Sequence, residues 1–303
     1  MAKLSMLSRP MLAGLREELI ALADLVVKAN ARVDVVGGKL RESSGSAWLY
    51  ADRLWVTNHH VIADARGKVI LTNGTQRITG EVVGKDAETD LAVIRVDTSI
   101  DANPLALKIG PAQLGELCFA IGAPLGEFAD TMSMGIISGL NRRLPQSGGM
   151  VLEDVLQTDA AINHGNSGGP LVDINGSVLG VNTAGIEAAN SIGFAVPTHT
   201  VAEVIPELIE HGAIARATIG AKVEIRRVGM SVVNELLVLE IHDEQSPLRP
   251  GDILHAIDGR PLSRRADLMR ALRRDVINRE VSVLLQRDGV RKEFVITPLV
   301  RPK

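Results

Sequence analysis

The residues best suited to covalent chemistry lie in one glycine-rich segment, residues 165–170 (GNSGGP). A serine hydroxyl is a poor nucleophile at neutral pH, so it needs a general base and hydrogen-bond donors for the oxyanion formed on attack. Glycines on both sides of Ser167 let backbone N–H groups approach a substrate carbonyl without interference from a Cβ. The segment therefore indicates a nucleophile. The alternative is a turn in which Ser167 only bonds the backbone.

A base and an acid for this serine stand upstream, in the order His, Asp, Ser. His59 and His60 follow the β-type run 54–57, and Asp90 opens the apolar run 90–94. A buried carboxylate there can hold a histidine in one tautomer. Taken singly, each histidine is also explained as a loop residue, and the aspartate as a turn residue that caps a strand. Together, on a β-rich chain, they indicate a triad in the chymotrypsin order.

The same segment fits Gly-x-Ser-x-Gly, the nucleophile elbow of α/β-hydrolases. That elbow needs a helix directly after the serine, but residues 168–170 are Gly-Gly-Pro, which disfavours a helix. It also needs an acid and then a histidine downstream. The later histidines fall on or beside a predicted helix or in a second unit of the chain, and they are His199, His211, His242 and His255. The elbow is therefore the weaker interpretation.

The elements that must position these side chains are mostly short strands. From about residue 31 the chain alternates β-type apolar runs with Gly, Asn and Asp, which is typical of an all-β sandwich or barrel. These runs include 54–57, 69–72, 78–83, 91–96, 178–182 and 193–196. Residues 198–211 then show helical spacing of apolar residues before Gly212, which predicts a helix with a glycine stop and a possible kink at Pro206.

A second, smaller unit follows from about residue 215. Its predicted strands are 236–241, 253–257, 281–286 and 291–297, and a short helix is predicted over 266–274. We therefore expect four parts. They are an N-terminal amphipathic helix at 1–30, a β-barrel unit at 31–200, a linker helix at 201–214 and a small α+β domain at 215–303.

Composition and charge exclude several classes of protein. The 303 residues carry 33 Lys and Arg against 36 Asp and Glu, and the aromatic residues are four Phe, two Trp and one Tyr. No nucleic-acid partner is expected, because such proteins need a basic face or aromatic stacking platforms. Cys118 is the only cysteine, and the histidines form no cluster with ligand spacing. We therefore expect no metal and no other cofactor.

The N-terminus is where export or membrane attachment has to be considered. The chain has no run of 18 apolar residues, so no integral membrane segment is expected. Residues 19–27 are mostly apolar and 29–31 imitate a cleavage site, but charged residues interrupt the run. The apolar spacing fits one face of an amphipathic helix, with Leu12, Leu15, Leu19, Leu22 and Val26. We expect a docking or oligomerisation helix and a cytoplasmic protein, with a cleaved signal or a frayed tail as alternatives.

Several blocks of the sequence resemble the HtrA family of chymotrypsin-fold serine proteases that carry PDZ domains. The most specific are TNHHV at 57–61, DLAVI at 90–94 and TDAAINHGNSGGP at 158–170, and two more are AIGAPLG at 120–126 and SIGFAVP at 191–197. The resemblance runs from about residue 31 to the end of the chain. It implies a mainly β protein in which a two-β-barrel, chymotrypsin-like protease domain is followed by a small α+β PDZ-like domain.

The resemblance also implies roles for individual residues. It selects His60 as the general base, because the family histidine directly precedes the Val-Ile pair, and Asp90, because the family aspartate opens the Asp-Leu-Ala block. Ser167 is then the nucleophile, and Asp90 orients the imidazole. The N–H groups of Gly165 and Ser167, with Asn166 between them, would form the oxyanion hole.

A specificity pocket is expected beside the serine. By position relative to the nucleophile, its floor involves Ala161 and Ile162, and its walls involve Ser191, Ile192 and Gly193. No acid stands at these positions to receive Lys or Arg. A shallow, apolar pocket favours small aliphatic side chains before the scissile bond.

In the second unit, Thr218, Ile219, Gly220 and Ala221 stand where PDZ domains cap the C-terminal carboxylate of a peptide with backbone N–H groups. The resemblance implies that such a peptide adds as an extended strand. Residues 246–250 lack the short helix that is usual there. A structural or regulatory module that only packs on the protease therefore stays an alternative.

The resemblance implies an ATP-independent serine endopeptidase that degrades unfolded or damaged proteins through an acyl-enzyme at Ser167. The alternative function is a chaperone-like or PDZ peptide-binding protein whose protease site is rarely competent. The expected partners are unfolded protein or peptide substrates, a C-terminal peptide at the PDZ-like domain, and further copies of the chain, with a trimer as the family's usual assembly. The complete set of triad residue types favours the enzyme.

Overall fold

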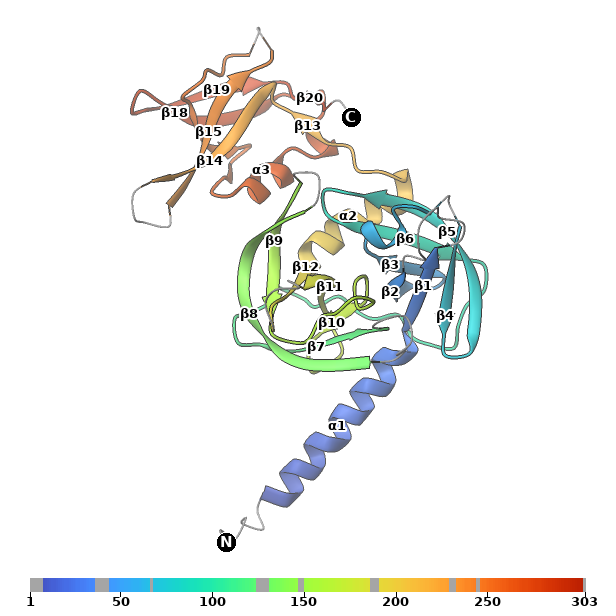
Figure 1. The fold of residues 1–303 in the computed structure, drawn as a ribbon. Coiled ribbons are helices and arrows are strands. Elements are labelled where there is room, and N and C mark those ends of the chain that lie inside the picture. The colour runs from blue at the N-terminus through green and yellow to red at the C-terminus, as the bar shows by residue number, and fades with distance from the viewer. Residues whose placement is uncertain are drawn as a thin grey trace. The chain divides into compact units, whose positions relative to one another are not determined.

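The computed structural model describes residues 8–35, 44–65, 68–123, 131–146, 150–185, 191–228, 233–243 and 246–301. The chain divides into two compact units, Met1–Ala213 and Ile214–Lys303. Both units are built mainly from antiparallel strands, and few helices accompany them (Figure 1). The expected mainly β class with two barrels, a second small domain and an N-terminal helix is confirmed.

The first barrel of unit one is closed by six strands in the order β1-β2-β3-β6-β5-β4. Their bounds are β1 Asn30–Val35, β2 Ser44–Ala51, β3 Leu54–Thr57, β4 Lys68–Asn73, β5 Gln76–Asp86 and β6 Leu91–Val96. Trp48 and Trp55 lie fully buried inside it together with Leu71 and Ile94. The interior of the barrel is therefore filled by side chains, so residues that react with a substrate must lie in its loops.

The second barrel of unit one is closed in the order β10-β11-β12-β9-β8-β7. Its strands are β7 Leu117–Gly122, β8 Thr131–Pro145, β9 Val151–Thr158, β10 Pro170–Val172, β11 Val178–Gly185 and β12 Gly193–Pro197. Cys118 packs in its aliphatic core, and burial raises the pKa of the thiol to about 11. The thiol is therefore protonated at neutral pH and behaves as a small apolar side chain.

Two helices accompany the barrels, α1 (Ser8–Lys28) and α2 (Thr198–His211). Helix α2 covers the predicted 198–211, begins and ends three residues before the linker helix expected at 201–214, and continues through Pro206. It ends at Gly212, whose left-handed backbone lets its N–H bond the Leu208 carbonyl at 2.9 Å. The helix lies so close to β5 that a Cβ at Gly84 would stand 2.7 Å from the Leu208 carbonyl oxygen. Among the helices of the described residues, none is both long and apolar enough to span a bilayer.

Unit two contains a twisted sheet in the order β14-β15-β16-β18-β19, with β17 paired to β16 and a separate β13-β20 pair. The bounds are β13 Ala217–Thr218, β14 Ala221–Val228, β15 Val233–Ile241, β16 Ile253–Ile257, β17 Arg260–Pro261, α3 Arg265–Ala271, β18 Val281–Arg287, β19 Val290–Ile296 and β20 Leu299–Val300. Helix α3 is shorter than the predicted 266–274, because Leu272 leaves the helical region and a 3-10 turn follows at Arg274–Val276.

Candidate active site

His60 and Asp90 come together because each stands at the end of a strand in the first barrel. Strands β3 and β6 pair with Thr57 opposite Ala92. The residues that follow Thr57 and those that precede Ala92 are therefore neighbours. The Nδ1 atom of His60 lies 2.8 Å from Oδ2 of Asp90, and the His60 backbone N–H donates to Oδ1 at 3.0 Å. A carboxylate on Nδ1 keeps the proton on that nitrogen and leaves Nε2 as an acceptor.

His59 takes a different position from His60. Its backbone N–H donates to the Asp90 carbonyl, and burial lowers the pKa of its imidazole. The sequence block offered two adjacent histidines, and it is the His60 ring that meets the carboxylate.

The Asp90 carboxyl group is buried and has a third donor that the sequence did not reveal. Its side chain is 6% exposed, and the hydroxyl of Thr183 on β11 donates to Oδ2 at 2.5 Å. The side-chain amide of Asn58 donates to the Asp90 backbone carbonyl, so the backbone of Asp90 is held in place as well. The φ of Asp90 is 54°, a left-handed conformation that aspartate tolerates better than most residues. Three donors therefore hold the carboxylate in one orientation.

Ser167 comes from the second barrel, in the loop before β10. Its carbonyl accepts the Ser46 N–H at 2.8 Å, which ties this loop to the first barrel, and the next N–H, that of Gly168, donates to the Asn182 carbonyl at 2.7 Å. Gly168 has φ 87°, and a Cβ there would stand 2.1 Å from the Ser46 carbonyl oxygen. Only glycine allows this approach of the two barrels.

The Ser167 hydroxyl does not engage His60 in this structure. Its Oγ donates to the backbone carbonyl of Thr183 at 2.8 Å, and within the described residues no hydrogen bond joins Ser167 to His60. Thr183 therefore holds Ser167 with its carbonyl and Asp90 with its hydroxyl. Rotation of the Ser167 side chain about χ1 breaks its hydrogen bond to the Thr183 carbonyl and turns the hydroxyl in another direction.

The loop before Ser167 presents backbone donors. The Ser46 hydroxyl donates to the Gly165 carbonyl at 2.7 Å, and the same Ser46 Oγ accepts the Ala123 N–H at 2.9 Å. Gly165 has φ 100°, a conformation that glycine adopts without strain. In the described part of the chain, the N–H groups of Gly165 and Ser167 donate to no protein acceptor, whereas the Asn166 N–H donates to the Asn163 carbonyl. Two N–H donors are thus available for a developing oxyanion.

The residues predicted for a specificity pocket differ in burial, and they do not all lie together. Ile162 is buried and packs against Gly193, where a Cβ would lie 2.8 Å from its Cδ1. Ile192 packs against the neighbouring cluster that contains Phe194. The remaining two residues, Ala161 and Ser191, are exposed. The structure therefore brings Ile162 and Gly193 together as an apolar contact near the serine loop.

Thr183 is the residue at this site that sequence reasoning missed. It lies 93 positions from Asp90, inside an apolar strand, and no motif distinguishes it from other strand threonines. Only the closure of the second barrel shows that the Thr183 side chain reaches the first barrel.

The described residues contain no group of three His, Cys, Asp or Glu side chains arranged to hold a metal ion.

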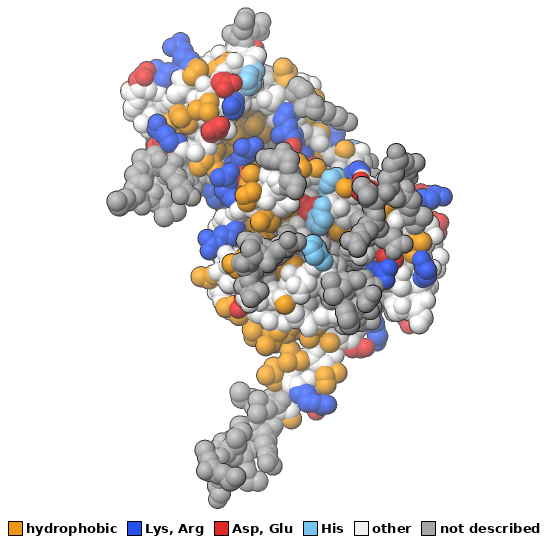
Figure 2. All heavy atoms as spheres, in the orientation of Figure 1, with side chains coloured by type: hydrophobic (Ala, Val, Ile, Leu, Met, Phe, Trp, Pro, Cys, Tyr) orange, Lys and Arg blue, Asp and Glu red, His pale blue; other side chains and the backbone are white. Residues whose placement is uncertain are grey.

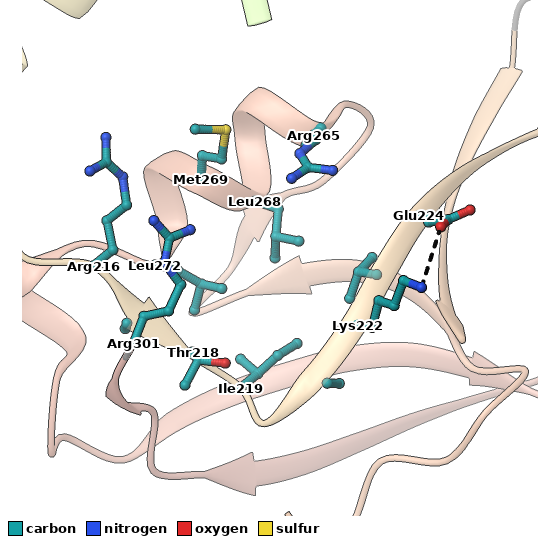
Figure 3. Close-up of a pocket in the computed structure, with 13 residues that line it drawn as sticks. Arg216, Thr218, Ile219, Lys222, Glu224, Arg265, Leu268, Met269, Leu272 and Arg301 are labelled. Carbon is teal, nitrogen blue, oxygen red and sulfur yellow. Dashed lines mark ion pairs between the residues drawn. The ribbon is translucent and has the colours of Figure 1, made fainter. Parts of the chain in front are cut away.

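In unit two, the predicted carboxylate loop lies between β13 and β14. The Thr218 hydroxyl accepts the Gly220 N–H at 3.1 Å, and the Gly220 carbonyl accepts the His242 N–H at 2.7 Å. Residues Thr218, Ile219 and Ala221 line a groove of about 300 Å³, and β14 and α3 contribute most of the other lining residues (Figure 3). The loop is therefore tied to the residue that directly follows β15, and it opens onto a groove.

Comparisons with known proteins match one family to each of the two units. Residues 45–181 match the trypsin-like peptidase domain family, and residues 217–297 match the PDZ domain family. The chain is 31% identical to "Protease Do-like 1, chloroplastic" of Arabidopsis thaliana, covering 93% of this chain and 69% of that protein. It is 32% identical to the "Probable periplasmic serine endoprotease DegP-like" of Rhizobium meliloti (strain 1021), covering 77% of this chain but 49% of that protein, or about half its length.

A solved structure agrees over nearly the whole chain. The HtrA-type protease AlgW with a tripeptide superposes with a TM-score of 0.79 at 32% identity, covering 93% of this chain and 97% of that one. Both barrels and the second unit therefore have counterparts in one solved protein.

Proposed function

Because the chain belongs to the HtrA family of serine endoproteases, we propose that it cleaves peptide bonds through an acyl-enzyme at Ser167. The observation that carries this proposal is the hydrogen-bonded pair of His60 and Asp90 on one barrel, joined to the Ser167 loop of the other by the bond from Ser46 to the Ser167 carbonyl. An acid, a base and a nucleophile thus stand at one barrel interface.

The reaction follows from these positions. Ser167 Oγ attacks the scissile carbonyl while Nε2 of His60 takes its proton. The N–H groups of Gly165 and Ser167 stabilise the oxyanion. The protonated imidazole then donates its proton to the leaving amine, and water, deprotonated by His60, releases the acyl group. Asp90 stays ionised throughout and holds the ring in place.

The substrates that fit this site are extended segments of unfolded or damaged proteins, cut without ATP. The contact of Ile162 with Gly193 supports a preference for small aliphatic side chains before the scissile bond. The groove beside residues 218–221 supports a role in binding C-terminal peptides. Cytoplasmic location stays a prediction.

Hydrolysis of a fluorescent casein without nucleotide tests the enzymatic proposal. We expect slow, continuous cleavage by the wild-type protein and none by Ser167→Ala. The matched control is Ser99→Ala, which removes an exposed hydroxyl bonded to Asp52 and leaves activity unchanged. Equal activity of the wild-type and Ser167→Ala proteins would contradict the proposal.

A second candidate function is a peptide-binding protein whose protease site is rarely competent. The hydrogen bond from Ser167 Oγ to the Thr183 carbonyl supports it, because the nucleophile is then not held by its base. The distinguishing measurement compares casein hydrolysis with and without added C-terminal peptides and across temperature. An activity that is absent under every condition, in a protein that still binds peptide, would favour this second function.

We also propose that the protein works as a homo-oligomer, with a trimer as the expected state. Figure 2 shows hydrophobic side chains gathered where α1 meets the barrels, and Leu15 and Ile20 of α1 are about half exposed, at 47% and 53%. Leu22 and Val26, which share the face of Leu15 nearer the C-terminal end of α1, are buried. Sedimentation of the full chain against one lacking residues 1–28 tests the helix. An unchanged mass would exclude it as the assembling element.

A further inference from the structure

Unit two has a second cavity, which lies where β19 ends and β20 begins. Its volume is about 390 Å³, and pockets that hold ligands typically measure about 300–1,000 Å³. Its lining comes from the 218–220 loop, from the chain after β15, from the residue before β18, and from β19 and β20. It shares only Thr218 and Ile219 with the groove beside α3. The proposed reaction at Ser167 does not involve this cavity.

Exposed apolar side chains of unit two gather around this cavity. Among the described residues of the unit, the large hydrophobic side chains that are well exposed all belong to β19 and β20, and they are Val290, Val295, Leu299 and Val300. Val295 and Leu299 line the cavity and are 62% and 54% exposed, whereas Ile219 and Ile296 beside them are buried. Apolar surface concentrated in one place marks a site of interaction. The cavity therefore offers contacts to aliphatic side chains of a ligand.

The charged lining of the cavity is acidic. Among the described residues, two carboxylates line it, Asp243 and Glu280, and no Lys, Arg or His does so. Asp243 has an interaction partner in the structure, whereas Glu280 is exposed and makes no hydrogen bond or ion pair within the described part of the chain. Strands β18 and β19 pair with Val281 opposite Ile296, so Glu280 stands beside the end of β19. Its carboxylate is therefore available to a cation on the ligand.

The strands that border the cavity can also bind an extended chain. Strand β19 is the last strand of its described sheet and pairs with β18 alone, so its outer edge has backbone donors and acceptors that an added strand can bond. The cations of β19, Arg291 and Lys292, lie at its other end. They are three or four residues from Val295, which is about 10 Å or more along a strand. Salt screens exposed charges at that distance, so they do not oppose a cation at Glu280.

We propose that this cavity and the adjoining edge of β19 bind an extended peptide segment that carries a Lys or Arg among aliphatic residues. The aliphatic side chains contact Val295 and Leu299, and the cation pairs with Glu280. Because the strand edge and these side chains recognise the interior of a peptide, the segment needs no free C-terminus. The groove beside α3 is not part of this site.

Fluorescence anisotropy with the full-length Ser167→Ala protein tests this, because that substitution prevents cleavage of the probe. The probes are three labelled decapeptides in which two Val residues stand on each side of a Lys, a Gln or a Glu. Their C-termini are amidated, so that they offer no terminal carboxylate to the 218–221 loop. We expect the Lys peptide to bind about threefold more tightly than the Gln peptide, the Glu peptide to bind least, and these differences to shrink with added salt.

Substitutions at the cavity make the test specific. Glu280→Lys should reverse the order of the Lys and Glu peptides, and Leu299→Ser should weaken all three without changing their order. The control, Glu81→Lys, makes the same charge change on an exposed residue of β5 in unit one and should leave the three affinities unchanged.

Three results would overturn the inference. They are equal affinity for the three peptides, no binding of any of them, and an order unaffected by Glu280→Lys, which would place the bound peptide elsewhere, such as at the protease site. Competition by N-acetyl-lysine amide at the concentration at which the unlabelled Lys peptide competes would also overturn it, because the cavity would then take a small cation and not an extended segment.

Discussion

At the scale of single residues, Thr183 connects Ser167 to Asp90. Its hydroxyl donates to Asp90 and its carbonyl accepts from Ser167. The order of motifs in the sequence predicted Ser167, Asp90 and one histidine of the pair at 59 and 60, and the resemblance to the HtrA family selected His60. Thr183 could not be predicted in this way, because its role depends on two barrels meeting and not on its neighbours in the chain.

Removing the Thr183 hydroxyl should weaken catalysis without unfolding the site. Thr183→Val keeps the shape but leaves Asp90 with one donor fewer, so we expect kcat/KM for a peptide substrate to fall about tenfold. Thr183→Ser, which restores the hydroxyl, should recover most of the activity. Full activity in the valine variant would show that the bond does not position the acid.

The lowered pKa of His59 predicts a dependence of stability on pH. Burial is the main cause and favours the neutral imidazole. A base whose pKa is lower in the folded state contributes stability above its unfolded pKa of about 6.5, and this contribution is lost as the pH falls. Urea unfolding between pH 7.5 and 5 should show this loss, and His59→Gln should reduce it. An identical pH slope in both proteins would contradict the assignment.

At the scale of elements, strand runs and the glycine stop were visible in the sequence, because periodicity and turn residues are local signals. Helix α2 spans the predicted 198–211, whereas α3 ends at Ala271 and not at residue 274. There the tertiary structure overrides the apolar spacing, since the N–H of Ala217 on β13 donates to the Leu272 carbonyl.

The close packing of α2 on β5 makes Gly84 a sensitive position. A Cβ there would meet two backbone carbonyl oxygens, those of Leu208 and Gly212, at 2.7 and 2.8 Å. We expect Gly84→Ala to lower the free energy of unfolding by about 1–3 kcal/mol, because backbone atoms must move. Gly14→Ala in α1, where a Cβ meets nothing within 4 Å, is the control and should be neutral or slightly stabilising. Equal effects of the two substitutions would contradict this packing.

At the scale of the whole molecule, the two units have separate cores and should unfold as separate transitions. Unit two contains a buried ion pair in which Nε and Nη2 of Arg287 each donate to the Asp252 carboxylate at 2.7 Å. Asp252→Ala leaves that guanidinium buried and unpaired, which typically costs about 3–5 kcal/mol. Calorimetry should therefore show one transition lowered and the other unchanged. A shift of both transitions together would contradict the independence of the units.

Covalent labelling of the full-length protein with a fluorophosphonate, followed by peptide mapping, tests whether Ser167 is the activated nucleophile. We predict a single phosphonylated residue, Ser167, and loss of labelling in His60→Ala, because an unactivated serine hydroxyl is a poor nucleophile. A label on another residue, or equal labelling of the wild-type and His60→Ala proteins, would contradict it.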